Sequence, residues 1–183
     1  MMKLDQPLFE EKQYIGFNKF SIIWRTVLAI FCFTAYYWSE NPKPVDVKGI
    51  HIVPYPIENI ENSGELFFLM GIFILLLSAI LIFVLHIHTR ITEQSITIDG
   101  LWTSRKVKID FSSIVSAQKV AYSKYLLNRA VYNLHQKGEI RFFTQGNDAI
   151  ELTDREGLKY RIGTQKPNEL LGVIQNQLEK KEV

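Results

Sequence analysis

Histidines and a lone cysteine are the side chains whose chemistry stands out in this chain, and their spacing argues against a reactive site. His86 and His88 stand two residues apart, which would place them on different sides of a helix, whereas a chelating pair on a helix needs a spacing of four. His51 and His135 have no cysteine or histidine companion at the spacing of a metal site. Cys32 is the single cysteine, so an intrachain disulfide is excluded. We therefore expect no metal ion and no cofactor.

The sequence also lacks the short motifs of common catalytic sites. It contains no Gly-x-Ser-x-Gly, no phosphate-binding loop and no dinucleotide fingerprint. The acids that could be imagined as acid–base pairs fall mostly at predicted turns or on polar strand faces, where a solvated surface explains them: Asp110, Asp148, Glu151, Asp154 and Glu156. We expect no catalytic residues and no enzymatic activity. The net charge of +2 is too small to predict a nucleic-acid partner.

One basic cluster supports a sharper hypothesis. Arg105, Lys106 and Lys108 stand close together, and Lys106 and Lys108 share one face of a predicted strand. Near anionic lipid, each exposed Lys or Arg contributes about 1 kcal/mol of attraction, so the cluster could contact lipid headgroups. A solvated strand face has the same composition, and both interpretations stay open.

A long apolar segment is the clearest structural element in the sequence. Leu66 to Leu85 contains neither a charge nor a proline. About 20 apolar residues are needed to cross the hydrocarbon core, and buried helices of soluble proteins are rarely apolar on every side over that length. We predict a transmembrane helix over residues 66–88, with His86 and His88 as interfacial residues at its end.

A second, shorter block predicts another span over residues 20–38. Arg25 lies within two turns of its start, where the long side chain can reach the headgroups. Tyr36, Tyr37 and Trp38 close the block with the composition of an aromatic interfacial belt. A cleaved signal peptide is the alternative, but the long flank with acids and the lack of small residues at the end favour a retained span.

The distribution of charge predicts the topology. Residues 39–65 between the spans carry more acids than lysines and contain four prolines, so we expect an extended extracytoplasmic loop. Lysine and arginine are in excess on both outer flanks, which predicts that both chain termini are cytoplasmic, in a bacterial inner membrane. The N-terminal flank, residues 1–19, mixes apolar and charged residues, and is predicted to be either an interfacial segment or a continuation of the first helix.

Short alternating runs predict a β-rich domain over residues 89–183. Five runs carry this pattern, with turn residues between several of them: Ser95–Asp99, Arg105–Ile109, Ile140–Thr144, Ala149–Leu152 and Leu158–Ile162. After Pro167, apolar residues recur at helical spacing through Leu178. We predict a meander of about seven strands closed by one amphipathic helix, which makes the chain an α+β membrane protein.

Five segments carry a resemblance to a known group: Glu11-Lys12-Gln13, Thr89–Thr92, Ile109–Ile114, Gly146–Leu152 and Tyr160–Leu171. With them the chain resembles small bacterial two-span membrane proteins of unknown function with a C-terminal pleckstrin-homology-like domain. The resemblance implies a sandwich or partly open barrel closed by a helix, and it implies no chemistry. The group often has a turn rich in glycine and tryptophan before an Ile-Arg pair. Here Ile140-Arg141 is present, but residues 128–138 lack such a turn, so the role of this segment stays open.

Two functions fit these patterns. The first is a non-enzymatic adaptor or accessory subunit, whose β domain presents strand edges to another membrane protein or to a second copy of the chain. The second is a module that senses anionic membrane lipid with its basic strand. An enzyme or transporter is disfavoured, because two spans are too few to form a pathway unless several copies assemble.

Overall fold

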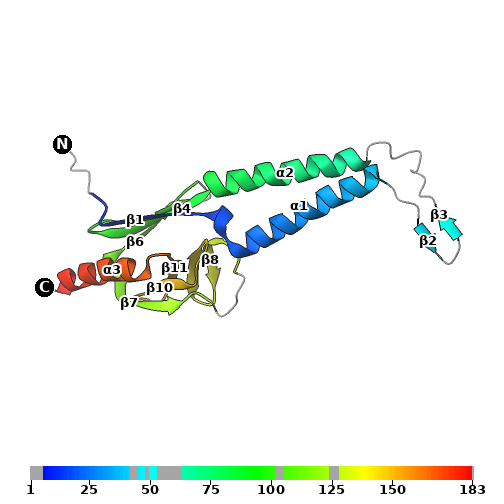
Figure 1. Ribbon diagram of the computed structural model, residues 1–183. Helices are drawn as coiled ribbons and strands as arrows, with labels where there is room; N and C mark the ends of the chain where they lie inside the picture. Colours follow the sequence, from blue (N-terminus) through cyan, green and yellow to red (C-terminus); the bar gives the residue numbers. More distant parts are fainter. Residues whose placement is uncertain are drawn as a thin grey trace. The chain divides into compact units, whose positions relative to one another are not determined.

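The computed structural model describes residues 6–41, 45–47, 50–52, 63–101, 105–123 and 128–182 of an α+β chain (Figure 1). Two compact units divide the chain. One unit contains residues 22–79, which form a helical hairpin. The other contains residues 1–21 together with residues 80–183, and is built from β-strands and a final helix. We call them the hairpin and the β unit.

Two long helices form the hairpin, α1 (Lys19–Glu40) and α2 (Ser63–Phe83). Aromatic side chains pack between them: the rings of Phe31 and Phe67 lie 6.3 Å apart, and those of Tyr36 and Phe68 lie 5.2 Å apart. Gly71 permits the close approach, because a Cβ atom there would stand 2.7 Å from the ring of Phe33. Small and aromatic residues therefore set the spacing of the helices.

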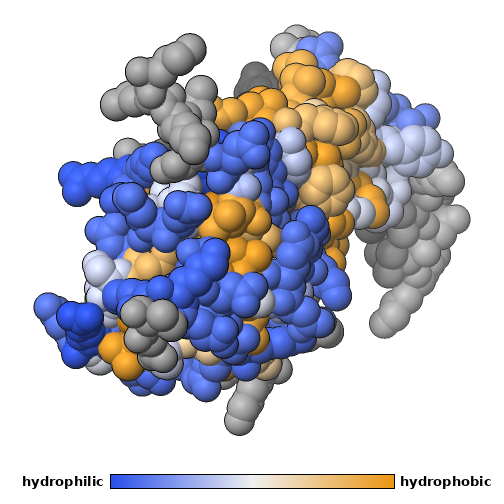
Figure 2. Space-filling model, turned by 90° about the vertical axis from the view of Figure 1, so that its left-hand side faces the viewer, coloured by the Kyte–Doolittle hydropathy of each residue, from blue (hydrophilic) through white to orange (hydrophobic). Residues whose placement is uncertain are grey.

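The outward surface of the hairpin is apolar. Phe31 is 60% exposed and Leu69 is 63% exposed, and the hairpin surface visible in Figure 2 is largely hydrophobic. Both helices are long and apolar enough to cross a membrane. Of the predicted loop over residues 39–65, the structure describes two short antiparallel strands, β2 (Val45–Val47) and β3 (Ile50–Ile52), and the rest lies largely outside the described residues.

Nine strands of the described chain form two sheets in the β unit. The four-stranded sheet has the order β1-β4-β5-β6, and the five-stranded sheet has the order β7-β10-β11-β9-β8. Short 3-10 turns, η1 (Ile15–Phe17) and η2 (Phe111–Ser113), follow β1 and β6. The bounds are β1 Phe9–Tyr14, β4 His86–Ile91, β5 Ser95–Asp99, β6 Val107–Asp110, β7 Ile114–Ala121, β8 Val131–Gln136, β9 Glu139–Phe143, β10 Asp148–Asp154 and β11 Lys159–Gly163.

The predicted meander is wrong for the second sheet. β10 pairs with β7 rather than with β9, and β9 and β11 are parallel neighbours in which Phe142 stands opposite Ile162. Parallel strands end on the same side of a sheet. The carboxyl ends of β9 and β11 therefore lie next to each other, and this arrangement creates the junction described below.

The alternative that the first helix continues back through residues 1–19 is wrong, whereas an interfacial location of this flank stays a prediction. Residues 9–14 form β1, which pairs antiparallel with β4 along its whole length, from Phe9 opposite Ile91 to Tyr14 opposite His86. The chain before the hairpin and the chain after it therefore belong to one sheet. The predicted domain boundary at residue 89 is accordingly replaced by a unit assembled from both sides of the hairpin.

The second predicted span is too long. α2 ends at Phe83, and β4 begins three residues later at His86. The apolar run continues to Leu85 in the sequence, so hydropathy does not mark the change from helix to strand. His86 and His88 are therefore residues of a strand in the β unit.

One core joins the two sheets and the final helix, α3 (Pro167–Glu182). Ile96 and Ile98 of β5, Ile150 of β10, and Leu170 and Ile174 of α3 are fully buried in it. Each such side chain contributes about 1.5–3 kcal/mol through burial. The predicted closing helix is confirmed, and the helix fills the side of the core that the sheets leave open.

Candidate functional site

A row of buried polar residues lies where the chain approaches the first helix. Strand β1 turns Phe9, Glu11 and Gln13 toward the interior, and the three are 3%, 8% and 3% exposed. Phe9 enters the apolar core, whereas Glu11 and Gln13 meet the ends of β9 and β11. With Asn18, which is 2% exposed and immediately precedes α1, they form what we call the polar latch.

Glu11 binds the segment that follows β11. The hydroxyl of Thr164 donates to Glu11 Oε2 at 2.6 Å, and the main-chain N–H of Gln165 donates to Oε1 at 2.9 Å. Hydrogen bonds to a carboxylate are stronger than neutral ones, and leaving a buried partner unsatisfied costs about 1–3 kcal/mol. Both carboxylate oxygens of Glu11 accept hydrogen bonds from the β unit itself, so this side chain holds the segment after β11 against β1.

Gln13 joins the ends of β9 and β11. Its Nε2 donates to the carbonyl oxygen of Gly163 at 2.9 Å, and its Oε1 accepts from the hydroxyl of Thr144 at 2.5 Å. An amide suits this position, because it offers a donor on one side and an acceptor on the other. The side chain can therefore pair with both strand ends at once.

Asn18 connects this junction to α1. Its Oδ1 accepts from the main-chain N–H of Ser21 at 3.2 Å, which is the N-cap arrangement of a helix start. Its Nδ2 donates to the carbonyl oxygens of Thr144, at 2.5 Å, and Asn128, at 2.7 Å. Next to it, the guanidinium of Arg129 lies 4.9 Å from the ring centre of Phe20. The first turn of α1 is therefore fixed to the β unit.

These contacts join two segments that are far apart in the chain. Glu11 and Gln13 of the early Glu-Lys-Gln segment bind the Gly163-Thr164-Gln165 segment, which lies about 150 residues later in the chain. The segment at residues 128–138, whose role the sequence left open, supplies Asn128 to the latch and then contains all of β8. The sequence analysis missed the latch, because residues 9–14 show no alternation of apolar and polar residues.

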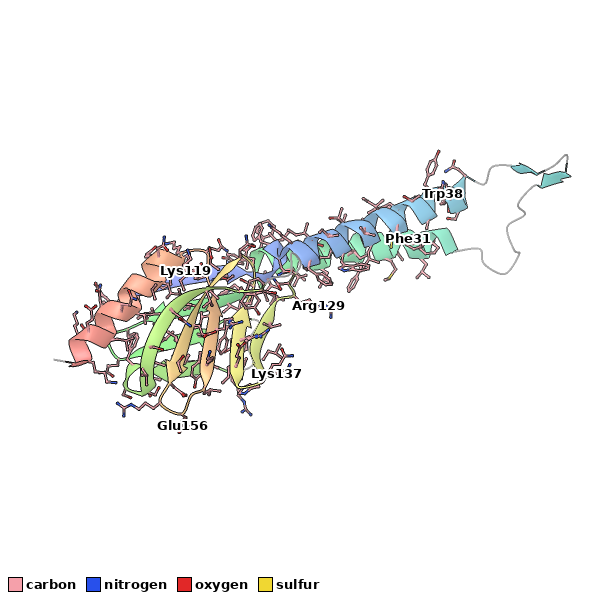
Figure 3. All side chains as sticks on the ribbon, turned by 90° about the horizontal axis from the view of Figure 1, so that it is seen from below. Phe31, Trp38, Lys119, Arg129, Lys137 and Glu156 are labelled. Atoms are coloured by element: carbon pink, nitrogen blue, oxygen red, sulfur yellow. The ribbon has the colours of Figure 1, made fainter. Side chains whose placement is uncertain are left out.

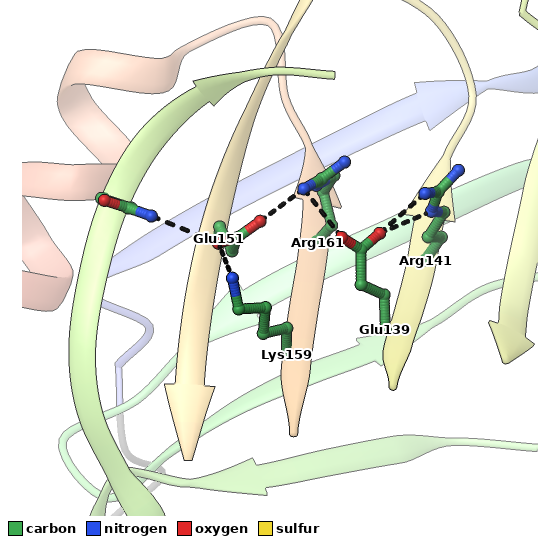
Figure 4. Close-up of polar contacts among 6 residues, drawn as sticks. Glu139, Arg141, Glu151, Lys159 and Arg161 are labelled. Carbon is green, nitrogen blue, oxygen red and sulfur yellow. Dashed lines mark hydrogen bonds and ion pairs between the residues drawn. The ribbon is translucent and has the colours of Figure 1, made fainter. Parts of the chain in front are cut away.

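A second polar cluster covers the outer face of the five-stranded sheet (Figure 4). Glu151 accepts from Gln118 at 3.2 Å and Lys159 at 3.0 Å through Oε1, and from Arg161 at 2.5 Å through Oε2. Arg161 also donates to Glu139 Oε1 at 3.0 Å, and Glu139 Oε2 accepts a bidentate pair from Arg141 at 2.7 and 2.9 Å. We call this the charge ladder, and its members lie on adjacent strands that the sheet register brings together.

The charge ladder holds Glu151 ionised. Burial alone would raise its pKa, but the hydrogen bonds from Arg161, Lys159 and Gln118 outweigh that effect and lower the pKa to about 2. The sequence analysis assigned Glu151 to a solvated surface, and its side chain is 4% exposed. Since its two oxygens are occupied by cations and an amide, we assign it a structural role.

Four of the interfacial residues predicted from the sequence lie on α1: Arg25, Tyr36, Tyr37 and Trp38. Near the end of this helix, Tyr37 is 54% exposed and Trp38 is 70% exposed. Such exposed aromatic residues match the composition of a membrane interface.

The two predicted interfacial histidines lie in β4. His86 Nδ1 is 2.9 Å from the carbonyl oxygen of Val84. His88 Nε2 lies 2.8 Å from a carboxylate oxygen of Glu10, and Nδ1 lies 3.4 Å from one of Asp99. The carboxylates approach different ring nitrogens, so they do not surround one common position. Among the described residues, no group of three His, Cys, Asp or Glu side chains has the arrangement of a metal site.

The structure separates the three predicted lipid-binding cations. Arg105 and Lys106 are exposed beside the turn between β5 and β6, whereas Lys108 in β6 forms an ion pair with Asp110 at 2.8 Å. The carbonyl oxygen of Arg105 also accepts a hydrogen bond from Tyr132, which fixes the end of this turn against β8. Only Arg105 and Lys106 therefore remain together as a candidate contact.

Two grooves flank α3 in the β unit. One, of about 340 Å³, is lined by Ile114 and Val115 at the start of β7, by Arg155, and by Leu178 and Lys181 of α3. The other, of about 370 Å³, lies on the β1 side and is lined by Leu8, Val173, Asn176, Gln177, Glu179 and Lys180. Figure 2 shows apolar surface among hydrophilic side chains on the face of the β unit that it presents.

Comparison with known proteins gave no match to a family model, a curated protein or a solved structure.

We predict that the charge ladder makes the β unit sensitive to acid. The pKa of Glu151 in the folded protein, about 2, lies below its ordinary value of 4.5, so protonation favours the unfolded state. The contribution is fully present above about pH 4.5 and is lost as the pH falls toward 2, with a magnitude on the order of 3 kcal/mol. Denaturant unfolding of the full chain in detergent, measured between these pH values, reports the loss.

A matched pair of variants separates this effect from general acid unfolding. Glu151→Gln is expected to be less stable at neutral pH and to lose much of the acid dependence. Glu156→Gln changes an exposed acid in the neighbouring turn and is expected to titrate as the wild type does. An unchanged acid dependence in Glu151→Gln would contradict the assignment.

Proposed function

We propose that this protein is a non-enzymatic adaptor of a bacterial inner membrane, in which the hairpin spans the bilayer and the β unit presents a binding surface to another membrane protein. The polar latch carries the proposal. It joins the chain before α1 to the strand ends of the β unit through Glu11, Gln13 and Asn18. The segment that precedes α1 is therefore an integral part of the β unit.

The pairing of β1 with β4 supports a two-span topology. Strands on either side of the hairpin belong to one sheet, so both flanks must lie on the same side of a membrane. Two spans satisfy that condition, whereas cleavage of the first helix as a signal peptide would remove β1 from the sheet. The excess of lysine and arginine on both flanks supports a cytoplasmic location for that side.

A pleckstrin-homology-like fold is part of the proposal for the β unit. Two sheets around one core, closed by the C-terminal helix α3, support it. The parallel pairing of β9 and β11 departs from the antiparallel meander that the sequence resemblance implied. The likeness therefore rests on the layers and the closing helix.

Affinity purification of the tagged full-length protein from its own membranes in mild detergent tests the adaptor. We expect one membrane protein at a stoichiometric amount, identified by mass spectrometry, and its loss when residues 85–183 are deleted. The same set of partners after the deletion would contradict the proposal, because the hairpin would then hold them. A solitary full-length protein, or a substrate-dependent activity of the pure protein, would contradict it as well.

A second candidate function, contact with anionic lipid, is favoured by the turn between β5 and β6. Gly100 has a φ of +142°, and a Cβ atom there would stand 2.2 Å from the carbonyl oxygen of His86. The turn therefore begins beside the first residue of β4, three residues after α2 ends at Phe83. Leu101 is 66% exposed and Arg105 is exposed, so an apolar and a cationic side chain of this turn are both accessible to an anionic lipid surface.

A fluorescent probe tests this contact. An environment-sensitive dye on Leu101→Cys, in a Cys32→Ser background and in lipid nanodiscs, is expected to report a less polar environment when anionic lipid is included. Arg105→Glu combined with Lys106→Glu should reverse the shift, because each cation contributes about 1 kcal/mol of attraction. Lys108→Glu is the control, since Lys108 pairs with Asp110. A spectrum independent of lipid charge and of these variants would exclude the contact.

A further inference from the structure

The four strands at the sheet edges differ in their capacity to accept another strand. β6 has four residues, and β8 is irregular, with a register shift and a positive φ at Asn133. β1 has six residues. β7 (Ile114–Ala121) has eight residues and keeps a regular register with β10 from Ser116 to Ala121. A long, regular edge is the usual template for strand addition.

The outer side of β7 presents main-chain groups in a regular pattern. β7 is the last strand of its sheet, and the described chain places no strand beside its outer side. The N–H of Tyr122 donates to the carbonyl oxygen of Asn147 at 2.8 Å, next to the pair of Ala121 and Asp148. Residues of an antiparallel pair alternate between bonding the neighbour and facing away. The main-chain groups of Ala117, Lys119 and Ala121 therefore point to the outer side.

Helix α3 runs alongside this edge and forms a groove with it. Lys119 Nζ lies 3.4 Å from Asn168 at the start of α3, and Figure 3 shows Lys119 next to that helix. At the other end of β7, the groove of about 340 Å³ contains the exposed side chain of Val115 and is closed by Leu178 of α3. The groove offers an apolar contact beside the free strand edge.

The charge of the surface formed by β7 and the groove indicates the charge of the segment that would bind it. β7 contains Lys119, whose Nζ lies 3.9 Å from Asp148 of β10 and stays partly exposed, and the groove lining contributes Arg155 and Lys181 and no acid. A second copy of β7 placed against the first would bring cationic surfaces together, which disfavours edge-to-edge pairing of the chain with itself. An acidic segment would instead gain charge complementarity.

We propose that the outer edge of β7, with the groove between β7 and α3, binds an extended acidic segment of the partner protein by strand addition. This inference rests on the proposed adaptor function and names its binding surface. Main-chain hydrogen bonds to Ala117, Lys119 and Ala121 supply affinity, an apolar side chain fills the groove at Val115, and acids pair with Lys119 and Arg155.

Peptide selection on the full-length protein in nanodiscs tests the surface. The probe is a displayed library of random peptides of about twelve residues, long enough to cover the strand. Selected peptides are expected to alternate apolar and acidic residues, and to slow hydrogen exchange at the amides of Ala117, Lys119 and Ala121. No enriched peptide family, or protection only on the β1 side of α3, would overturn the proposal.

Variants of the edge separate main-chain pairing from charge. Lys119→Pro removes an outward N–H that β10 does not use, and should weaken binding by about tenfold or more, whereas Lys119→Ala keeps the N–H and should cost less. Arg155→Glu should also weaken binding, and Lys137→Glu makes a comparable charge reversal in the turn between β8 and β9, away from the edge (Figure 3). Circular dichroism and thermal unfolding verify that each variant folds.

The outcomes distinguish this inference from the adaptor function. The strand-addition site would be overturned if the selected peptides bound Lys119→Pro as tightly as the wild type. It would also be overturned if Lys137→Glu weakened peptide binding as much as Arg155→Glu does. A stoichiometric membrane partner whose binding is unchanged by Lys119→Pro would overturn the site and leave the adaptor standing. Peptides that bind at β7, with a full-length protein that purifies alone, would leave the site standing and remove the adaptor.

Discussion

The hydrogen bonds of Glu11, Gln13 and Asn18 are the constraint on which the rest of the structure depends. They fasten a strand that precedes the hairpin to the ends of two parallel strands that follow it. Each of these polar side chains is nearly buried, so its partners cannot be replaced by water without a cost of about 1–3 kcal/mol apiece. The parallel arrangement of β9 and β11 is required for this, because only neighbouring strand ends can share Gln13.

The latch also gives the proposed function its physical basis. Asn18 caps the first turn of α1 and is itself bonded to Thr144 and Asn128 of the β unit. The charge ladder stiffens the sheet to which β7 belongs, because Glu151 bridges β10 to Lys159 and Arg161 of β11 and to Gln118 of β7.

The sequence predicted those helices and strands whose formation depends on a repeating pattern of neighbouring residues. The apolar blocks predicted both long helices, alternation predicted β5, and helical spacing predicted α3. β1 was missed because its buried face contains Glu11 and Gln13, so a polar residue stands where periodicity expects an apolar one. The end of α2 was missed because Val84 and Leu85 continue the apolar run. The charge ladder and the latch depend on which strands pair, and that information is spread over about 150 residues.

The central claim, that the β unit needs the strand preceding the hairpin, can be measured with two soluble fragments. One contains residues 85–183, and the other joins residues 6–18 to residue 85 through a short Gly-Ser linker, because the N–H of Ile15 already bonds the carbonyl of Leu85 at 3.0 Å. The account predicts a cooperatively folded, well-dispersed amide spectrum for the joined fragment and a poorly folded one for residues 85–183. Equal folding and equal stability of the two fragments would contradict it.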